Sequence, residues 1–155
     1  MKREQGFSLV EMVIVVAIVA ILAGIALPSY FSHVSKGYRS DAMGALTAFA
    51  QAMERHFTIN GTYIGADGGT VAITSETAPT IFPTEAPIDG SNKVYDLLIT
   101  EASATSYTLI AKPKAGGRMK DDGIIGLKST GVRGWDKDGD TDPFGTGETC
   151  WDSDC

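Results

Sequence analysis

The sequence predicts an α+β fold in which one long N-terminal helix, kinked near Pro28, packs on a four-stranded antiparallel sheet. Three observations predict it. Residues 7–27 are apolar or small except for Ser8 and Glu11, and an apolar stripe at helical spacing continues to Phe57. Two short segments rich in Val, Ile, Leu, Tyr and Thr follow in the second half of the chain, and two more flank the turn Ser129-Thr130-Gly131. With 155 residues, the chain has room for one modest domain and an anchor.

The apolar run at residues 7–27 is long enough to cross a hydrocarbon core of about 30 Å as a helix. Lys2 and Arg3 precede the run, and few positive charges follow it before Lys36. The positive-inside rule therefore predicts a cytoplasmic N-terminus and an exported remainder. A cleaved secretory signal peptide is the alternative, but its apolar core would be shorter. We expect a retained membrane anchor.

Glu11 is the one carboxylate inside this run. An acidic side chain at membrane depth costs roughly 2.5–3.5 kcal/mol on insertion scales, and residues of this kind usually have a partner or a function. We therefore expect Glu11 to be functional.

Beyond Pro28 the apolar residues recur every three or four positions, which predicts a helix with one buried face. Asn60-Gly61 is a stop signal, so the helix is predicted from about Phe7 to Phe57. The stripe consists of Phe31, Val34, Tyr38, Ala42, Ala45, Leu46, Phe49, Met53 and Phe57.

Residues 59–93 show little periodicity and predict a long connection with at most short elements. The predicted strands form two hairpins and span residues 94–100, 107–112, 124–128 and 132–135. Such a sheet can bury one face against the helix stripe.

The phrase GFSLVE at residues 6–11, followed by the apolar run and Pro28, resembles the N-terminus of type IV pilins. The resemblance implies that residues 1–6 are a leader removed after Gly6 by a prepilin peptidase, and that Phe7 becomes the methylated N-terminus. It further implies that Glu11 pairs with the Phe7 amine of a neighbouring subunit in the filament, and that helix is lost just before Pro28 on packing.

On this resemblance the chain divides into a leader (1–6), a hydrophobic helix that is membrane anchor and filament core (7–34), and a globular head (35–155). The implied partners are other pilin subunits, the peptidase, the inner-membrane assembly platform and, before assembly, the membrane itself. The implied location is the inner membrane for the precursor and the cell exterior for the assembled pilus.

The helix phrase at residues 38–57 and the strand phrase at residues 106–113 look like minor pilins of the PilE kind. Those proteins usually carry a cysteine in the third strand region, where this chain has residues 121–125 without one. Major and minor pilin therefore both stay open.

The formal net charge of −6 comes from residues 136–155, which hold six Asp and one Glu against one Lys. Cys150 and Cys155 can form a disulfide outside the cytoplasm, closing a small loop that contributes about 2 kcal/mol.

Carboxylates at alternate positions in the acidic segment can surround a hard cation such as calcium. Their spacing departs from a helix–loop–helix calcium loop, which favours a solvated acidic turn. The candidate ligands are Asp136, Asp138, Asp140 and Asp142.

His33 and His56 are isolated, and no nucleophile–base pair or phosphate-binding glycine loop stands out, so we do not expect an enzyme or a further cofactor. The acidic C-terminal segment argues against nucleic acid as a partner. The predicted function is thus a structural pilus subunit for motility, adhesion or DNA uptake. A type II secretion pseudopilin with a C-terminal calcium site is the alternative.

Overall fold

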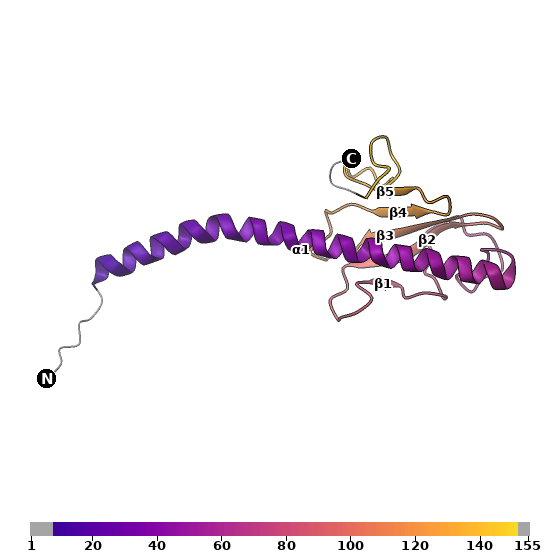
Figure 1. The fold of residues 1–155 in the computed structure, drawn as a ribbon, viewed down its shortest axis with the longest axis horizontal. Coiled ribbons are helices and arrows are strands. Elements are labelled where there is room, and N and C mark those ends of the chain that lie inside the picture. Colours follow the sequence, from indigo (N-terminus) through magenta and orange to yellow (C-terminus); the bar gives the residue numbers. More distant parts are fainter. Residues whose placement is uncertain (1–7, 152–155) are drawn as a thin grey trace. The chain divides into compact units, whose positions relative to one another are not determined.

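The structure is a computed structural model that describes residues 8–151. It contains one helix, α1 (Leu9–Asn60), followed by strands β1 (Glu85–Ala86), β2 (Tyr95–Ala102), β3 (Tyr107–Pro113), β4 (Ile125–Lys128) and β5 (Arg133–Trp135) (Figure 1). The chain divides into two compact units, residues 1–36 and residues 37–155, which we call the N-terminal unit and the head.

Helix α1 ends where the sequence places its stop signal. The N–H of Gly61 donates to the carbonyl of Phe57 at 2.7 Å, and Gly61 takes a φ of +71°, a conformation that favours glycine. Pro28 lies inside α1, and helix is assigned on both sides of it. The kink near Pro28 stays a prediction.

The five strands form one antiparallel sheet in the order β1-β2-β3-β4-β5. The prediction of a long helix and an antiparallel sheet is confirmed, and the four predicted strands correspond to β2–β5 within two residues at each end. The sheet has five strands rather than the four expected, because Glu85 and Ala86 form an additional strand that pairs with Asp96 and Tyr95 at the free edge of β2. Two residues show no periodicity, so the sequence could not reveal β1.

The long connection between α1 and β2 also pairs with β2 through isolated bridges, Ile73 with Ala102 and Thr77 with Ile99. These bridges and β1 satisfy backbone groups that an open edge would expose.

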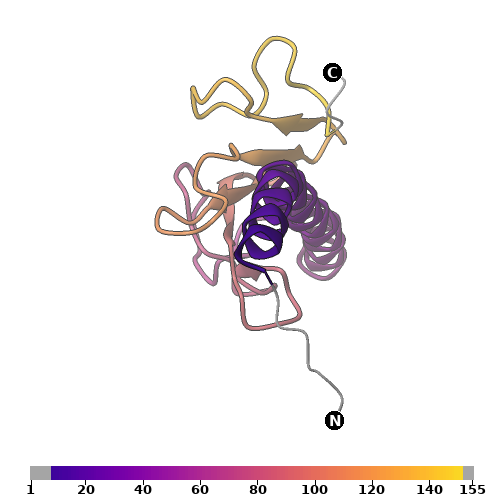
Figure 2. The ribbon, with the colours of Figure 1, turned by 90° about the vertical axis from the view of Figure 1, so that its left-hand side faces the viewer.

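In the head, α1 lies beside the sheet (Figure 2), and the part of the predicted stripe from Ala42 to Met53 is buried in the core. Phe31, at the start of the predicted stripe, is 49% exposed and lies in the N-terminal unit. Tyr95, Leu97 and Ile99 alternate with less buried residues along β2, as expected for a strand with one covered face. Phe49 stacks on Phe82 with ring centroids 5.0 Å apart, so the long connection also contributes to this core. The helix contributes Ala42, Ala45, Leu46, Phe49 and Met53 to the core.

The segment after β5 returns over the outer part of the sheet. Trp135 N donates to Glu148 O at 3.0 Å, and Trp151 Nε1 donates to Gly126 O at 3.1 Å. A Cβ built at Gly134 would overlap the backbone carbonyl of Pro143, so only glycine allows this close approach.

Candidate functional site

In the N-terminal unit, residues 9–27 form an apolar stretch of α1 whose large side chains are exposed. Exposed fractions reach 79% for Leu9 and 71% for Ile25. The helix is long and apolar enough to cross a membrane by length and composition. An exposed apolar surface of this extent is expected to be covered by lipid or by other helices.

Glu11 has a local partner that the sequence analysis missed. One of its carboxylate oxygens accepts a hydrogen bond from the backbone N–H of Ser8 at 3.1 Å, and Met12 N donates to Ser8 O at 3.2 Å. Ser8 and Glu11 thus have the spacing of a capping box and form one of its two hydrogen bonds, the one from the backbone N–H to the Glu side chain. The spacing S-x-x-E was the signal that could have revealed it.

Two other predicted N-terminal site residues, Gly6 and Phe7, lie outside the described residues. Gly24 lies four residues after Ala20 and has open space where a Cβ would stand. This small-residue pair leaves room for close approach of another helix.

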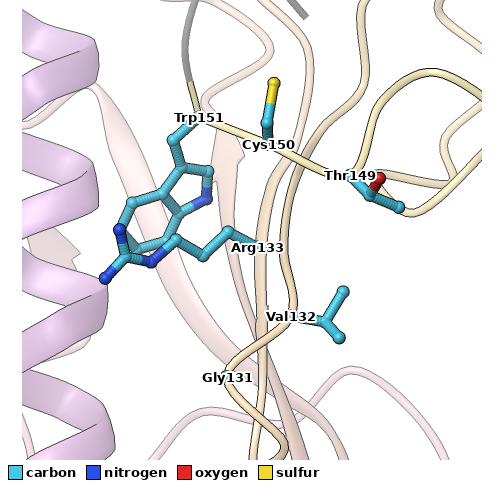
Figure 3. A pocket seen from close by; sticks show the side chains of 6 residues that line it. All are labelled: Gly131, Val132, Arg133, Thr149, Cys150 and Trp151. Atoms are coloured by element: carbon cyan, nitrogen blue, oxygen red, sulfur yellow. The ribbon is translucent and has the colours of Figure 1, made fainter.

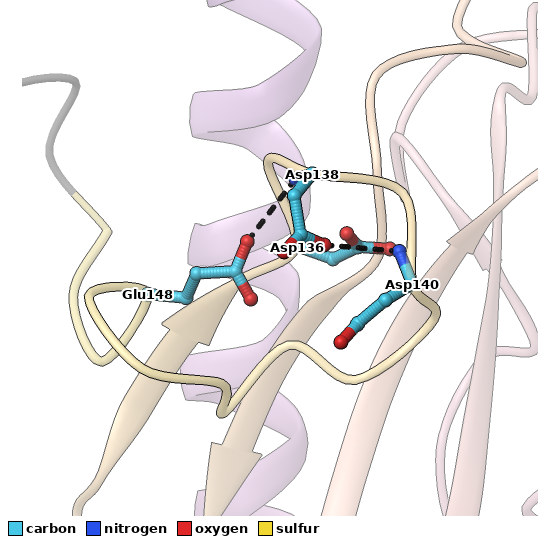
Figure 4. Close-up of side chains that lie close together, drawn as sticks. All are labelled: Asp136, Asp138, Asp140 and Glu148. Atoms are coloured by element: carbon cyan, nitrogen blue, oxygen red, sulfur yellow. Dashed lines mark hydrogen bonds between the residues drawn. The ribbon is translucent and has the colours of Figure 1, made fainter.

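A second candidate site lies in the loop after β5. One carboxylate oxygen from each of Asp136, Asp138, Asp140 and Glu148 lies within 4.8 Å of the others (Figure 4). Asp136 directly follows β5, and Glu148 is held beside Trp135 by the backbone hydrogen bond described above. The ends of the loop are therefore fixed by the sheet. We call these four residues the acidic cluster.

Three of the four predicted ligands belong to the acidic cluster, and Asp142 does not. Asp142 Oδ1 accepts from the backbone N–H of Phe144 at 3.0 Å, which shapes the next turn. Glu148 takes its place in the cluster and was missed, because the expected position was counted from a standard twelve-residue loop. Allowing one inserted residue would have found it.

The backbone shapes the acidic cluster. Asp136 is 3% exposed and accepts from the N–H groups of Gly139 at 2.7 Å and Thr141 at 3.2 Å. Glu148 is 5% exposed, and its Oε1 accepts from Lys137 N at 2.6 Å and Asp138 N at 3.2 Å. Hydrogen bonds of this kind support ionised carboxylates inside a protein.

Cys150 lines a surface hollow together with Arg133 and Trp151, and the Arg133 guanidinium lies 4.8 Å from the centre of the Trp151 ring (Figure 3). Cys155 lies outside the described residues, so the disulfide between the two cysteines stays a prediction. The remaining lining residues are Gly131, Val132 and Thr149.

The head also contains partly buried polar groups that join α1 to the sheet and loops. Glu54 accepts hydrogen bonds from the hydroxyls of Tyr63 and Tyr107, each at 3.0 Å. Asp122 accepts from the Tyr95 hydroxyl at 2.6 Å and from the Arg39 guanidinium. Burial, and then the hydrogen bond to a carboxylate, raises the pKa of each of the three tyrosines. These interactions are structural.

Comparison with known families gives two matches. The model described as type IV minor pilin ComP, DNA uptake sequence receptor, matches residues 28–123. The model described as the prokaryotic N-terminal methylation motif matches residues 1–27.

Individual proteins are also similar to this chain over most of its length. Fimbrial protein EcpC of Eikenella corrodens is 29% identical over 136 residues, which cover 88% of this chain and 78% of that protein. Type II secretion system core protein G of Pectobacterium carotovorum is 24% identical over 136 residues, covering 88% and 83%. Among solved structures, the Neisseria meningitidis non-core minor pilin PilV aligns with a TM-score of 0.48 and 19% identity over 73% of this chain and 97% of that chain.

Proposed function

Because the chain belongs to the type IV minor pilin family, we propose that it is a filament subunit made as a membrane-anchored prepilin, cleaved after Gly6 and assembled into a pilus. Its family and relatives are structural pilins, which confirms the prediction that it is not an enzyme. The inner membrane, the peptidase and the assembly platform are parts of the proposal.

The observation that carries this proposal is the exposed apolar surface of residues 9–27, interrupted only by Glu11, in a segment that matches the methylation motif. A soluble protein would have to bury this surface, whereas an anchor covers it with lipid. A filament covers it with neighbouring copies of the same helix. Transfer from lipid to filament therefore keeps the apolar side chains out of water throughout.

In this proposal, Glu11 sets the axial position of each subunit relative to its neighbour in the filament. Cleavage after Gly6 would create a charged amine on Phe7, and both charges would enter a low-dielectric filament core. Pairing Glu11 with the amine of a neighbour removes two unpaired buried charges at once, each of which would be strongly destabilising. The Ser8–Glu11 hydrogen bond holds the carboxylate at the first turn of α1 before assembly.

Replacement of Gly6 tests processing. Gly6→Ala is expected to leave the leader on the chain and the precursor in the membrane, as judged by intact mass and by fractionation. Gly44→Ala is the control, because Gly44 is an exposed helical glycine with open space at its Cβ position. Normal leader removal and normal filaments in Gly6→Ala would contradict the proposal.

A type II secretion pseudopilin is the second candidate, supported by the match to core protein G over 88% of this chain. The two functions differ in the phenotype of a gene deletion. A pilin deletion removes surface filaments, whereas a pseudopilin deletion blocks release of secreted proteins.

Capture of DNA is a narrower role suggested by the description of the matched family. The match ends at residue 123, before the acidic segment that carries the net charge. We expect no binding of duplex DNA at physiological salt, since affinity of this kind depends on Lys and Arg contacts to phosphate. Salt-sensitive DNA binding by the purified full chain would instead support a receptor.

A further inference from the structure

The acidic cluster contains an oxygen atom that the protein itself does not satisfy. Only 5% of Glu148 is exposed to solvent, so the residue is 95% buried. Its Oε1 accepts two backbone hydrogen bonds. Its Oε2 is buried and has no hydrogen-bond partner within the described residues. Burying an oxygen of an ionised carboxylate without a partner is strongly unfavourable.

The position of this oxygen suggests what would satisfy it. Figure 4 shows the Glu148 carboxylate directed toward the side chains of the acidic cluster. One oxygen from each of the four residues lies within 4.8 Å of the others, so the four negative groups repel one another at close range. A cation among them would remove this repulsion and provide the missing partner of Glu148 Oε2.

The chemistry of the donors identifies the class of cation. All four side chains offer carboxylate oxygens, which suit hard divalent cations, whereas zinc prefers His and Cys ligands. Calcium accepts flexible arrangements of six to eight oxygens, whereas magnesium requires near-ideal octahedral geometry and usually keeps several of its waters. A loop that brings four carboxylates together therefore suits calcium better than magnesium.

We propose that Asp136, Asp138, Asp140 and Glu148 bind one Ca²⁺ ion in the head, with Glu148 Oε2 as a ligand. Backbone carbonyls or water complete the coordination of six to eight oxygens that calcium requires.

The loop shares features with helix–loop–helix calcium sites, although here it follows a strand. Counted from Asp136, carboxylates occupy positions one, three and five. Position six is Thr141, whose φ of +76° is of the kind that glycine provides at that position in those loops. The acidic residue that closes the loop, Glu148, stands one place later than in the standard twelve-residue loop.

The bound ion would join the two ends of the loop. Asp136 N donates to Ile124 O at 2.9 Å, and Glu148 O accepts from Trp135 N. Between these ends, Pro143 and Phe144 cover Gly126 and Gly134. Calcium would therefore stabilise the segment that covers β4 and β5. This binding is independent of filament assembly, and either proposal can fail alone.

Calorimetric titration of Ca²⁺ into the calcium-stripped full chain in detergent tests the proposal. We expect one ion per chain, with a Kd in or below the range of about 10⁻⁴–10⁻³ M found in extracellular modules, and weaker binding of Mg²⁺. Glu148→Gln should weaken calcium binding at least roughly tenfold by removing a charged ligand. Gln Oε1 can still accept the hydrogen bonds from Lys137 and Asp138, so the loop should keep its fold.

Asp142→Asn is the matched control, because Asp142 lies in the same loop but outside the cluster. Its calcium affinity should equal that of the unaltered chain. If Glu148→Gln fails to fold, as judged by circular dichroism, Asp138→Asn provides the same test, since Asn Oδ1 can replace the acceptor for Asp140 N. Absence of saturable calcium binding by the unaltered chain would overturn the proposal. So would unchanged affinity in the folded cluster variant, or equal affinity for Mg²⁺.

Discussion

Arg39 on α1 and Asp122 in the loop before β4 form a two-point ion pair, in which Arg39 Nε donates to Asp122 Oδ2 at 2.9 Å and Arg39 Nη2 donates to Oδ1. Their side chains are only 15% and 10% exposed, and the guanidinium lies 3.6 Å from the centre of the Trp135 ring. Trp135 Nε1 in turn donates to Asp122 O at 2.7 Å. One residue on the helix thus fixes the loop that precedes the last two strands.

Asp122→Ala is expected to destabilise the protein by about 3 kcal/mol, because it leaves Arg39 and the Tyr95 hydroxyl without their partner in a poorly solvated place. Glu76→Ala is the matched control. It breaks the Lys112–Glu76 pair, whose side chains are both 43% exposed, and should cost less than about 1 kcal/mol. Denaturant unfolding of the full chain in detergent measures both, and equal costs would contradict a structural role for the Arg39–Asp122 pair.

Stability should fall as the pH rises above 10. The pKa values of Tyr63, Tyr95 and Tyr107 are raised in the folded protein above the ordinary value of 10.0, chiefly by burial. Above this pH the unfolded chain loses tyrosine protons that the folded chain keeps, so the unfolded state binds fewer protons and is favoured. Below pH 10 the contribution of the three tyrosines is fully present.

Thermal unfolding between pH 8 and pH 11 measures this dependence. Tyr95→Phe should flatten it, whereas Tyr30→Phe should not, since Tyr30 is 62% exposed. An identical slope in the two variants would show that the buried tyrosines do not cause the alkaline loss.

Two Gly→Ala substitutions should have opposite effects. At Gly134 a Cβ would overlap the Pro143 carbonyl, so Gly134→Ala should destabilise the head by about 1–3 kcal/mol and displace the acidic loop. Gly44 is an exposed helical glycine with open space at its Cβ position, so Gly44→Ala should stabilise by about 0.5–1 kcal/mol. The midpoints of denaturant unfolding of the two variants and the unaltered chain measure these effects. An unchanged midpoint for Gly134→Ala would mean that the loop does not lie on β5 as described.

The helix and the main strands were predictable because they rest on local sequence patterns. The stripe of α1 shows directly in the sequence, and segments rich in β-branched and aromatic residues indicate β2 and β3. Glu148 could be found from the sequence only by allowing one inserted residue in the loop, because its approach to Asp136 depends on how the loop returns along β5. Likewise, nothing local to Arg39 indicates that it meets Asp122, which is 83 residues away in the chain.

Glu11→Val should separate processing from assembly. The cleavage junction is Gly6–Phe7, so the variant should still lose its leader, but the Phe7 amine would enter the filament core without its partner. We expect mature subunits that accumulate in the membrane and filaments that are scarce. Electron microscopy and quantitative immunoblotting of sheared fractions measure this outcome.

The contrary result is equally clear. A normal yield of filaments from Glu11→Val would mean that the carboxylate does not pair with a neighbour. The hydrogen bond with Ser8 N would then be its main role. Ser8→Ala is the control, because it leaves both the Glu11 carboxylate and the Ser8 backbone N–H in place and should assemble normally.

Mass spectrometry of filaments sheared from the surface of the producing bacterium tests the central claim most directly. The account predicts that these filaments contain this chain, with an N-terminal peptide that begins at a methylated Phe7 and lacks residues 1–6. Absence of the chain from the filaments, together with recovery of the whole chain from the membrane with residues 1–6 still attached, would contradict it.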